Sequence, residues 1–82
     1  MRQMRVLSAV DSSPKMKVFR AVGNLPNAWT TSIKEQVRFD PLAYLRELER
    51  EGLVRVTDGP HGNLGYKWAL TPKGRLKIRV SA

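Results

Sequence analysis

The sequence predicts a single α+β domain, built from three helices and a small antiparallel sheet that includes a β-hairpin. Apolar residues recur at helical spacing behind helix-start signals in the first part of the chain. Two alternating runs, 53–57 and 66–71, flank a turn-rich stretch, as the strands of a hairpin do. A length of 82 residues suits one domain, which we divide into an N-terminal segment (1–12), a core (13–75) and a basic tail (76–82).

The first predicted helix covers about residues 14–22. The motif SSP at residues 12–14 supplies a serine cap and a proline at the first helical position, where its missing N–H is not needed. Gly23 and Asn24 then end the helix. Its apolar side consists of Met16, Phe19, Ala21 and Val22. Residues 1–12 are compatible with a helix or with an extended chain.

Two short helices joined by a tight turn are predicted next, after a short extended piece at residues 28–30. Ser32 and Glu35 have the spacing of a capping box, so we expect the second helix to begin at Ser32. The dipeptide Asp40-Pro41 then begins the third helix after only a few residues. Two helices connected in this way form a helix-turn-helix.

The third predicted helix, 40–51, has a leucine at every third position. We expect Leu42, Leu45 and Leu48 to be buried in the core, because helices bury such apolar stripes. Gly52 suits the left-handed position that follows a helix end.

The hairpin and the end of the chain follow this helix. We expect Trp29 and Trp68 to lie in the core or at a dimer contact. Thr71-Pro72 resembles a cap and the first turn of a helix, whereas the alternation in RLKIRV (75–80) favours a strand. Both alternatives stay open for this segment.

The order of helix, short strand, helix, helix and hairpin resembles the winged helix-turn-helix fold. The segments YLRELEREGLVRV (44–56) and YKWALTPKGR (66–75) are similar to the corresponding helix and wing of MarR-like, PadR-like and ArsR-like regulators. With the helices before them, the resemblance covers about residues 13–75. It implies double-stranded DNA binding, usually as a homodimer, and transcriptional control. The chain lacks the ligand clusters of metal-sensing ArsR-like proteins and the long flanking helices of MarR-like dimers.

Charge is the most informative bulk property. Fifteen Lys and Arg against seven Asp and Glu give a net charge of +8, which favours a polyanionic partner. The net charge is +4 over residues 1–31, −1 over 32–58 and +5 over 59–82. We therefore expect the ends and the wing to hold phosphates, and the helix 40–51 to supply selectivity in the major groove.

The expected DNA contacts come from the helix-turn-helix, the 58–66 wing on the backbone or in the minor groove, and the tail. They are Thr31, Ser32, Lys34, Ala43, Tyr44, Arg46, Glu47, Arg50, His61, Asn63, Lys67, Lys73 and Arg75. The alternatives are a solvated helix face with an Arg46–Glu49 pair, a polar hairpin loop, and a purely capping role for Ser32.

Other functional classes have little support in the sequence. One histidine, no cysteine and no recognisable nucleophile or carboxylate pair argue against an enzyme, a metal site or a cofactor. No apolar run is long enough for a membrane span, and the absence of cysteine fits the cytoplasm, with the nucleoid as the expected location. The alternative function is a winged-helix protein-interaction module without DNA readout.

Overall fold

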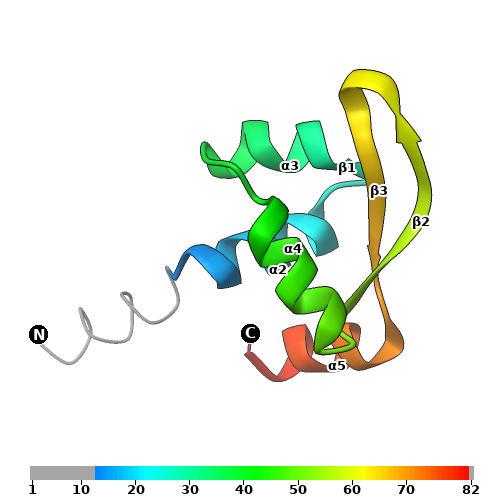
Figure 1. Cartoon of the computed structure of the whole chain (residues 1–82). Helices are drawn as coiled ribbons and strands as arrows, with labels where there is room; N and C mark the ends of the chain where they lie inside the picture. Colours follow the sequence, from blue (N-terminus) through cyan, green and yellow to red (C-terminus); the bar gives the residue numbers. More distant parts are fainter. Residues whose placement is uncertain (1–12, 82) are drawn as a thin grey trace, which may run out of the picture.

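The structure is a computed structural model and describes residues 13–81 (Figure 1). Within this range, helices pack on one another and against an antiparallel sheet whose hairpin extends from the body of the domain. The elements are α2 (Pro14–Asn24), β1 (Ala28–Trp29), α3 (Thr30–Val37), α4 (Leu42–Arg50), β2 (Val54–His61), the 3₁₀ turn η1 (Gly62–Leu64), β3 (Gly65–Leu70) and α5 (Pro72–Ser81). This order confirms the predicted α+β, winged-helix arrangement. The segment 1–12 and Ala82 lie outside the described residues.

The sheet has three antiparallel strands in the order β1-β3-β2. Trp68 of the central strand β3 pairs with Ala28 on one side and with Val56 on the other. The β2–β3 register shifts on the way to the hairpin tip, after Val56 and again after Asp58. Trp68 is buried, as expected for a side chain on the covered face of a central strand.

The core lies where α2, α3 and α4 meet the sheet. Leu45 and Leu48 are buried as predicted, but Leu42 is 39% exposed, so its assignment to the core was wrong. Residues three apart on a helix are rotated by about 300°, so the leucine stripe turns away from the core by about 60° at each step. The buried residues are Val18, Phe19, Ala21, Val22, Ala28, Ile33, Leu45, Leu48, Leu53, Val54 and Trp68.

Local hydrogen bonds explain where α2 and α4 begin. The Ser13 hydroxyl accepts the Met16 N–H at 3.3 Å ahead of Pro14, which confirms the predicted cap. The Asp40 carboxylate accepts the Leu42 N–H at 3.1 Å and orients the start of α4.

A Schellman motif ends α4. The Gly52 N–H donates to the Glu49 carbonyl at 3.0 Å, and the Leu53 N–H donates to the Leu48 carbonyl at 2.9 Å. Gly52 has φ 77°, which confirms its predicted left-handed position. Leu48 and Leu53 are both buried, so this turn leads the chain from α4 directly into the core side of β2.

The predicted capping box at the start of α3 is wrong. The helix begins at Thr30, two residues before Ser32, and its N-cap Trp29 makes no side-chain capping bond. The Thr30 hydroxyl instead bonds to backbone and side-chain groups of β3, which fixes the chain as it leaves β1. Tertiary anchoring therefore sets this helix start rather than a local cap.

The segment after β3 is a helix, so the strand favoured by its alternation was wrong. The Thr71 hydroxyl accepts the Gly74 N–H at 3.0 Å, with Pro72 in the first turn, as the competing cap signal indicated. Gly74 is buried where a Cβ would lie 2.0 Å from the Leu53 carbonyl oxygen, so glycine lets α5 approach the start of β2 closely. The helix continues into the expected basic tail.

Candidate nucleic-acid interface

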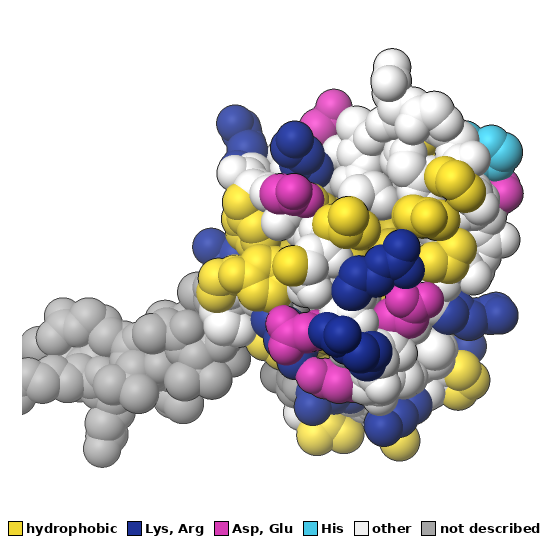
Figure 2. All heavy atoms as spheres, in the orientation of Figure 1, with side chains coloured by type: hydrophobic (Ala, Val, Ile, Leu, Met, Phe, Trp, Pro, Cys, Tyr) yellow, Lys and Arg dark blue, Asp and Glu magenta, His cyan; other side chains and the backbone are white. Residues whose placement is uncertain are grey.

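The exposed side of α4 changes character along its length. At the N-terminal end, Leu42 and Ala43 are exposed, and the half-buried Tyr44 ring meets Phe39 edge-on with ring centroids 5.8 Å apart. Towards the C-terminal end, the exposed residues are charged and include Arg50. Figure 2 shows hydrophobic side chains across the middle of this face and mixed basic and acidic side chains below them. The N-terminal end of α4, which the sequence predicted to face the bases, is therefore mainly apolar.

Arg46 packs against the sheet instead of projecting freely from α4. Its Nη1 donates to the Glu49 carboxylate at 3.0 Å, which confirms the predicted i,i+3 pair. Its guanidinium carbon lies 5.0 Å from the centroid of the Tyr66 ring and 5.6 Å from that of Trp68. The Glu49 hydrogen bond is the largest cause of the raised pKa of Arg46. This arginine already has partners in the free protein.

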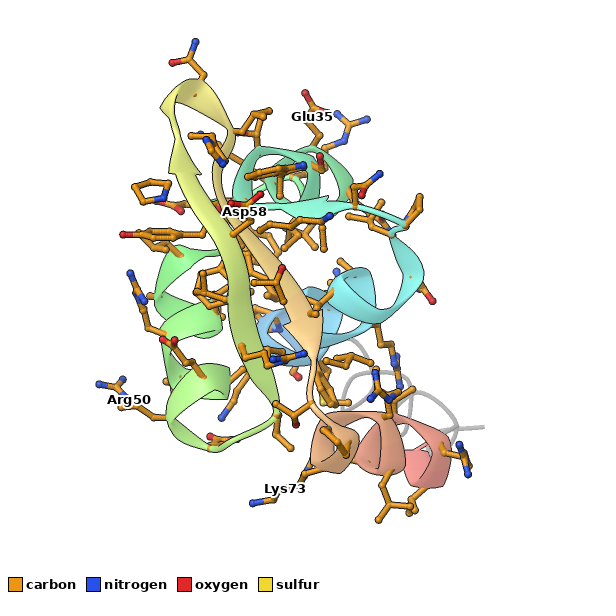
Figure 3. The ribbon with its side chains drawn as sticks, turned by 90° about the vertical axis from the view of Figure 1, so that its right-hand side faces the viewer. Glu35, Arg50, Asp58 and Lys73 are labelled. Atoms are coloured by element: carbon orange, nitrogen blue, oxygen red, sulfur yellow. The ribbon has the colours of Figure 1, made fainter. Side chains whose placement is uncertain are left out.

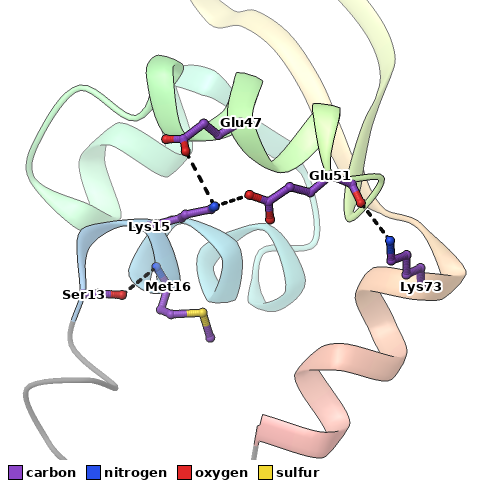
Figure 4. Close-up of polar contacts among 6 residues, drawn as sticks. All are labelled: Ser13, Lys15, Met16, Glu47, Glu51 and Lys73. Carbon is purple, nitrogen blue, oxygen red and sulfur yellow. Dashed lines mark hydrogen bonds and ion pairs between the residues drawn. The ribbon is translucent and has the colours of Figure 1, made fainter.

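Two acidic residues at the C-terminal end of α4, Glu47 and the capping Glu51, are paired with α2. Lys15 of α2 forms an ion pair with Glu51, and its ammonium also lies 3.7 Å from the Glu47 carboxylate (Figure 4). Lys15 therefore offsets negative charge that would otherwise repel phosphate. Sequence reasoning missed this contact because the residues are far apart in the chain.

The start of α3 is fastened to β3 by one hydroxyl group. Thr30 Oγ1 donates to the Tyr66 carbonyl at 3.2 Å, and it accepts the Tyr66 N–H at 3.2 Å and the Trp68 indole N–H at 2.9 Å. Gly65 permits this approach, because a Cβ there would lie 2.8 Å from the Thr30 Cβ. The Thr31 hydroxyl donates to the Asn63 carbonyl at the hairpin tip. These bonds hold the wing beside the N-terminus of α3.

His61 also belongs to the wing tip and is exposed. Its ring meets Trp29 edge-on with centroids 5.4 Å apart, and its Nε2 lies 3.0 Å from the Asp58 carboxylate. The hydrogen bond with His61, followed by the Gly59 N–H, lowers the pKa of the Asp58 carboxyl. The predicted wing residues His61 and Asn63 thus come together with Thr31 near one end of α3.

A hollow of about 650 Å³ follows the exposed side of α3 towards α4. Two cations, Lys34 and Arg38, line it together with Thr31, Glu35 and Phe39. Arg38 has φ 72° in the turn between the two helices, and sequence reasoning did not single it out. The signal available in the sequence was an arginine in the short turn between two predicted helices. Ser32, by contrast, is half-buried and does not line this hollow.

The remaining predicted contacts lie on other surfaces. Lys67 alternates with Tyr66 and Trp68, which face α4, so Lys67 points to the opposite side of the sheet and lines a separate groove of about 360 Å³ with Arg75. Arg50 and Lys73 line a third groove, at the C-terminal end of α4. Apart from Arg46, which packs on the sheet, the structure therefore distributes the predicted basic residues over three surfaces.

Other kinds of site find no support within residues 13–81. No cluster of three or more His, Cys, Asp or Glu side chains in that range could hold a metal ion. No helix in the described part of the chain is both long enough and apolar enough to cross a membrane.

Comparisons with known proteins support the fold. No protein-family model and no curated protein sequence matches the chain. The crystal structure of transcriptional regulator PA4135 matches with a TM-score of 0.70 and 20% identity, over 92% of this chain and 58% of that one. The crystal structure of transcriptional regulator PA3341 matches with a TM-score of 0.70 and 24% identity, over 94% of this chain and 60% of that one. The chain thus spans about three fifths of the length of these regulators and shares their winged-helix fold.

Proposed function

We propose that this protein binds double-stranded DNA sequence-specifically and regulates transcription. The observation that carries the proposal is the bond between the Thr31 hydroxyl and the Asn63 carbonyl, which holds the wing tip beside the N-terminus of α3. A helix N-terminus, the exposed side of α4 and a wing then lie together, in the arrangement by which winged helices dock on a duplex. The two regulators with the same fold support the same assignment.

In the proposed complex, the N-terminal half of α4 enters the major groove. The exposed Leu42 and Ala43 and the half-buried Tyr44 contact thymine methyl groups, because accessible apolar groups fit those methyls best. Arg50 contacts a guanine edge or a phosphate further along the helix. The wing reaches the adjacent backbone or minor groove.

Phosphate contacts position the protein in this arrangement. Lys34 and Arg38 along α3 are suited to one strand, since both line the hollow that begins at Thr31. Lys73 and Arg75 of α5 remain predicted phosphate contacts. Neutralising Lys73, Arg75, Lys77 and Arg79 together should reduce the slope of log K against log salt by about 1 for each phosphate that these side chains bind. An unchanged slope would remove α5 from the interface.

The proposal is tested by selecting bound duplexes from a random pool and measuring their affinity at low and moderate salt. We expect salt-sensitive binding and a recovered sequence motif; a two-fold symmetric motif would indicate a homodimer. Replacing thymine by deoxyuridine in the motif removes only the methyl group. At about 0.8 kcal/mol for one buried methyl, each contacted thymine should weaken binding about fourfold. Equal affinity for all duplexes would refute sequence-specific reading.

A protein-interaction module is the second candidate function. The exposed Leu42 at the start of α4 and the prior engagement of Arg46 favour it. Retention on duplex DNA separates the two functions, because a docking module without DNA readout would show none at either salt concentration. Binding at DNA would also place the protein at the nucleoid in the cytoplasm.

A further inference from the structure

A groove of about 720 Å³ separates the C-terminal end of α4 from α5. Its apolar side chains are the buried Leu53 together with Leu76 and Val80, which are 59% and 80% exposed. Its charged side chains are Arg50, Glu51, Lys73 and Lys77. A partly apolar floor with a mainly basic rim is thus open on the described surface, and the rim shares Arg50 and Lys73 with the proposed DNA contacts.

The groove has a fixed geometry because several bonds attach α5 to the end of α4. Lys73 Nζ donates to the Glu51 carbonyl at 3.1 Å (Figure 4), and the Thr71 hydroxyl donates to the Gly52 carbonyl at 2.6 Å. The close packing of Gly74 on Leu53 sets the distance between the two elements. Figure 3 shows Arg50 and Lys73 projecting from α4 and α5 towards the same side of the molecule.

The two exposed apolar residues of α5 form one strip. Leu76 and Val80 are four apart on the helix and therefore lie one above the other, about 6 Å apart along its axis. Helices leave such a pair in water only at an energetic disadvantage, because burying apolar side chains of this size is favourable. The strip matches a pair of apolar residues spaced by three or four on a second helix.

The charge around this strip identifies the chemistry of the partner. Within its described residues, α5 carries Lys73, Arg75, Lys77 and Arg79 and no acidic side chain. The one acid in the groove, Glu51, is paired with Lys15. We propose that the groove binds an acidic amphipathic helical segment of another protein, with its apolar side on Leu76 and Val80 and its carboxylates on the basic rim.

Other occupants fit less well. A second copy joined through α5 in an isologous contact would place like-charged helices against each other, which is unfavourable. Duplex DNA could pair with the cations, but it would place its charged phosphate backbone against the apolar Leu76 and Val80. Residues 1–12 of the chain carry two arginines and one aspartate, so they provide no acidic complement.

The test uses a fluorescein-labelled peptide of about four helical turns, with leucines at spacings of three and four and glutamates beside them. Binding to the full chain is followed by fluorescence anisotropy. Two further peptides are matched controls, one with lysine in place of glutamate and one with serine in place of leucine. We expect only the acidic peptide with leucines to bind, at moderate salt.

Variants locate the binding site. Leu76→Ser, Val80→Ser and Lys77→Glu should each weaken peptide binding by about tenfold, the size of effect expected for removing one interface anchor or reversing one rim charge. Arg79→Glu makes the same charge change on α5 outside the groove lining, and Leu64→Ser makes the same polarity change at an exposed wing position. Both controls should bind within about twofold of the unchanged protein. Thermal melting confirms that every variant is folded.

Several results would overturn the proposal. One is that the lysine peptide binds as tightly as the acidic peptide, and another is that the three groove variants bind the acidic peptide as tightly as the unchanged protein. A third is a concentration-dependent dimer that Leu76→Ser abolishes, because the groove would then bind a second copy of the chain. Protection of the Lys77 ammonium from acetylation by duplex DNA would assign the groove to nucleic acid. Leu76→Ser should leave duplex binding intact, so failure of this proposal and failure of DNA binding are distinguishable.

Discussion

The Lys15 ammonium of α2 is ion-paired with the Glu51 carboxylate at the C-terminal end of α4. This hydrogen-bonded contact is the main cause of the raised pKa of Lys15, and the nearby Glu47 carboxylate adds to it. The glutamates of α4 have the same sign of charge as DNA. In the proposed complex, the pairing of Glu47 and Glu51 with α2 would offset part of this negative charge before DNA arrives.

Replacing Lys15 therefore tests the electrostatic role of α2. Lys15→Met should weaken duplex binding about three- to tenfold at low salt, and this difference should shrink as salt screens the two carboxylates. Unfolding free energy should fall by no more than about 1 kcal/mol, because the pair is partly exposed. Lys17→Met removes the same charge from the same helix and should have a smaller effect. Adding Glu51→Gln to Lys15→Met should restore much of the binding; no recovery would contradict the offset.

The Thr30 hydroxyl should contribute more to stability than the neighbouring Thr31 hydroxyl. Thr30→Val leaves the Tyr66 N–H and the Trp68 indole N–H without this acceptor, so we expect a loss of about 1–3 kcal/mol in the free energy of unfolding. Thr31→Val removes one bond at the exposed wing tip and should reduce it by less than about 1 kcal/mol. Urea denaturation measures both, and equal losses would contradict the anchoring role of Thr30.

Alanine substitutions at two wing glycines, Gly62 and Gly65, should distinguish the cost of backbone strain from the cost of a steric clash. Both have positive φ, but a Cβ at Gly65 would meet Thr30 at 2.8 Å, whereas no atom of the described residues lies within 4 Å of a Cβ at Gly62. Gly62→Ala should reduce the free energy of unfolding by about 1–2 kcal/mol through left-handed strain alone. Gly65→Ala should add a steric penalty of about 1–3 kcal/mol. The thermal melting midpoint of the Gly65→Ala variant should therefore lie below that of Gly62→Ala. Equal midpoints would show that α3 can move away from the wing without a loss of stability.

Asp58 should make the wing sensitive to acid. Its pKa is lowered, chiefly by the hydrogen bond with His61, so its contribution to stability is complete above the unfolded-state pKa of about 3.9 and is lost as pH falls through the lower folded-state pKa. His61→Ala should raise the pKa of Asp58 towards its ordinary value, measured by NMR titration of the carboxyl carbon. Asn63→Ala, another change at the wing tip, is the control and should leave the pKa of Asp58 unchanged.

The sequence was sufficient to predict most elements of the fold, because local signals govern them. The Ser13 cap, the left-handed Gly52 and the alternation around Trp68 each act within a few residues, and the structure contains all three. The Thr71 cap also competed with the alternating pattern of α5. The cap prevailed there because Gly74 lets the helix pack on Leu53, a contact that periodicity does not reveal.

The candidate interface was less predictable because long-range contacts organise it. The start of α3 is set by the hydrogen bonds of Thr30 to β3, and the negative charge at the end of α4 is partly offset by Lys15 of α2. Neither pairing has a local pattern. The prediction that Leu42 is buried was wrong for a different reason. Leucines spaced by threes do not stay on one side of a helix, and here Leu45 and Leu48 face the core while Leu42 is turned away from it.

Arg46 and Arg50 should separate stability from DNA reading. Arg46→Ala removes the interactions with Glu49, Tyr66 and Trp68 and should reduce the free energy of unfolding by about 1 kcal/mol, whereas Arg50→Ala should change it by less than about 0.5 kcal/mol.

Duplex binding should show the reverse order. Arg50→Ala should weaken binding to the selected motif about tenfold with an unchanged melting midpoint, since one good base contact contributes about 1–3 kcal/mol. Arg46→Lys keeps the charge but cannot stack a planar group on the rings, so it should resemble Arg46→Ala in stability. The prediction would be wrong if Arg46→Ala altered base preference and left the free energy of unfolding unchanged. Arg46 would then leave the aromatic rings of β3 when DNA binds, and Arg46 rather than Arg50 would contact the bases.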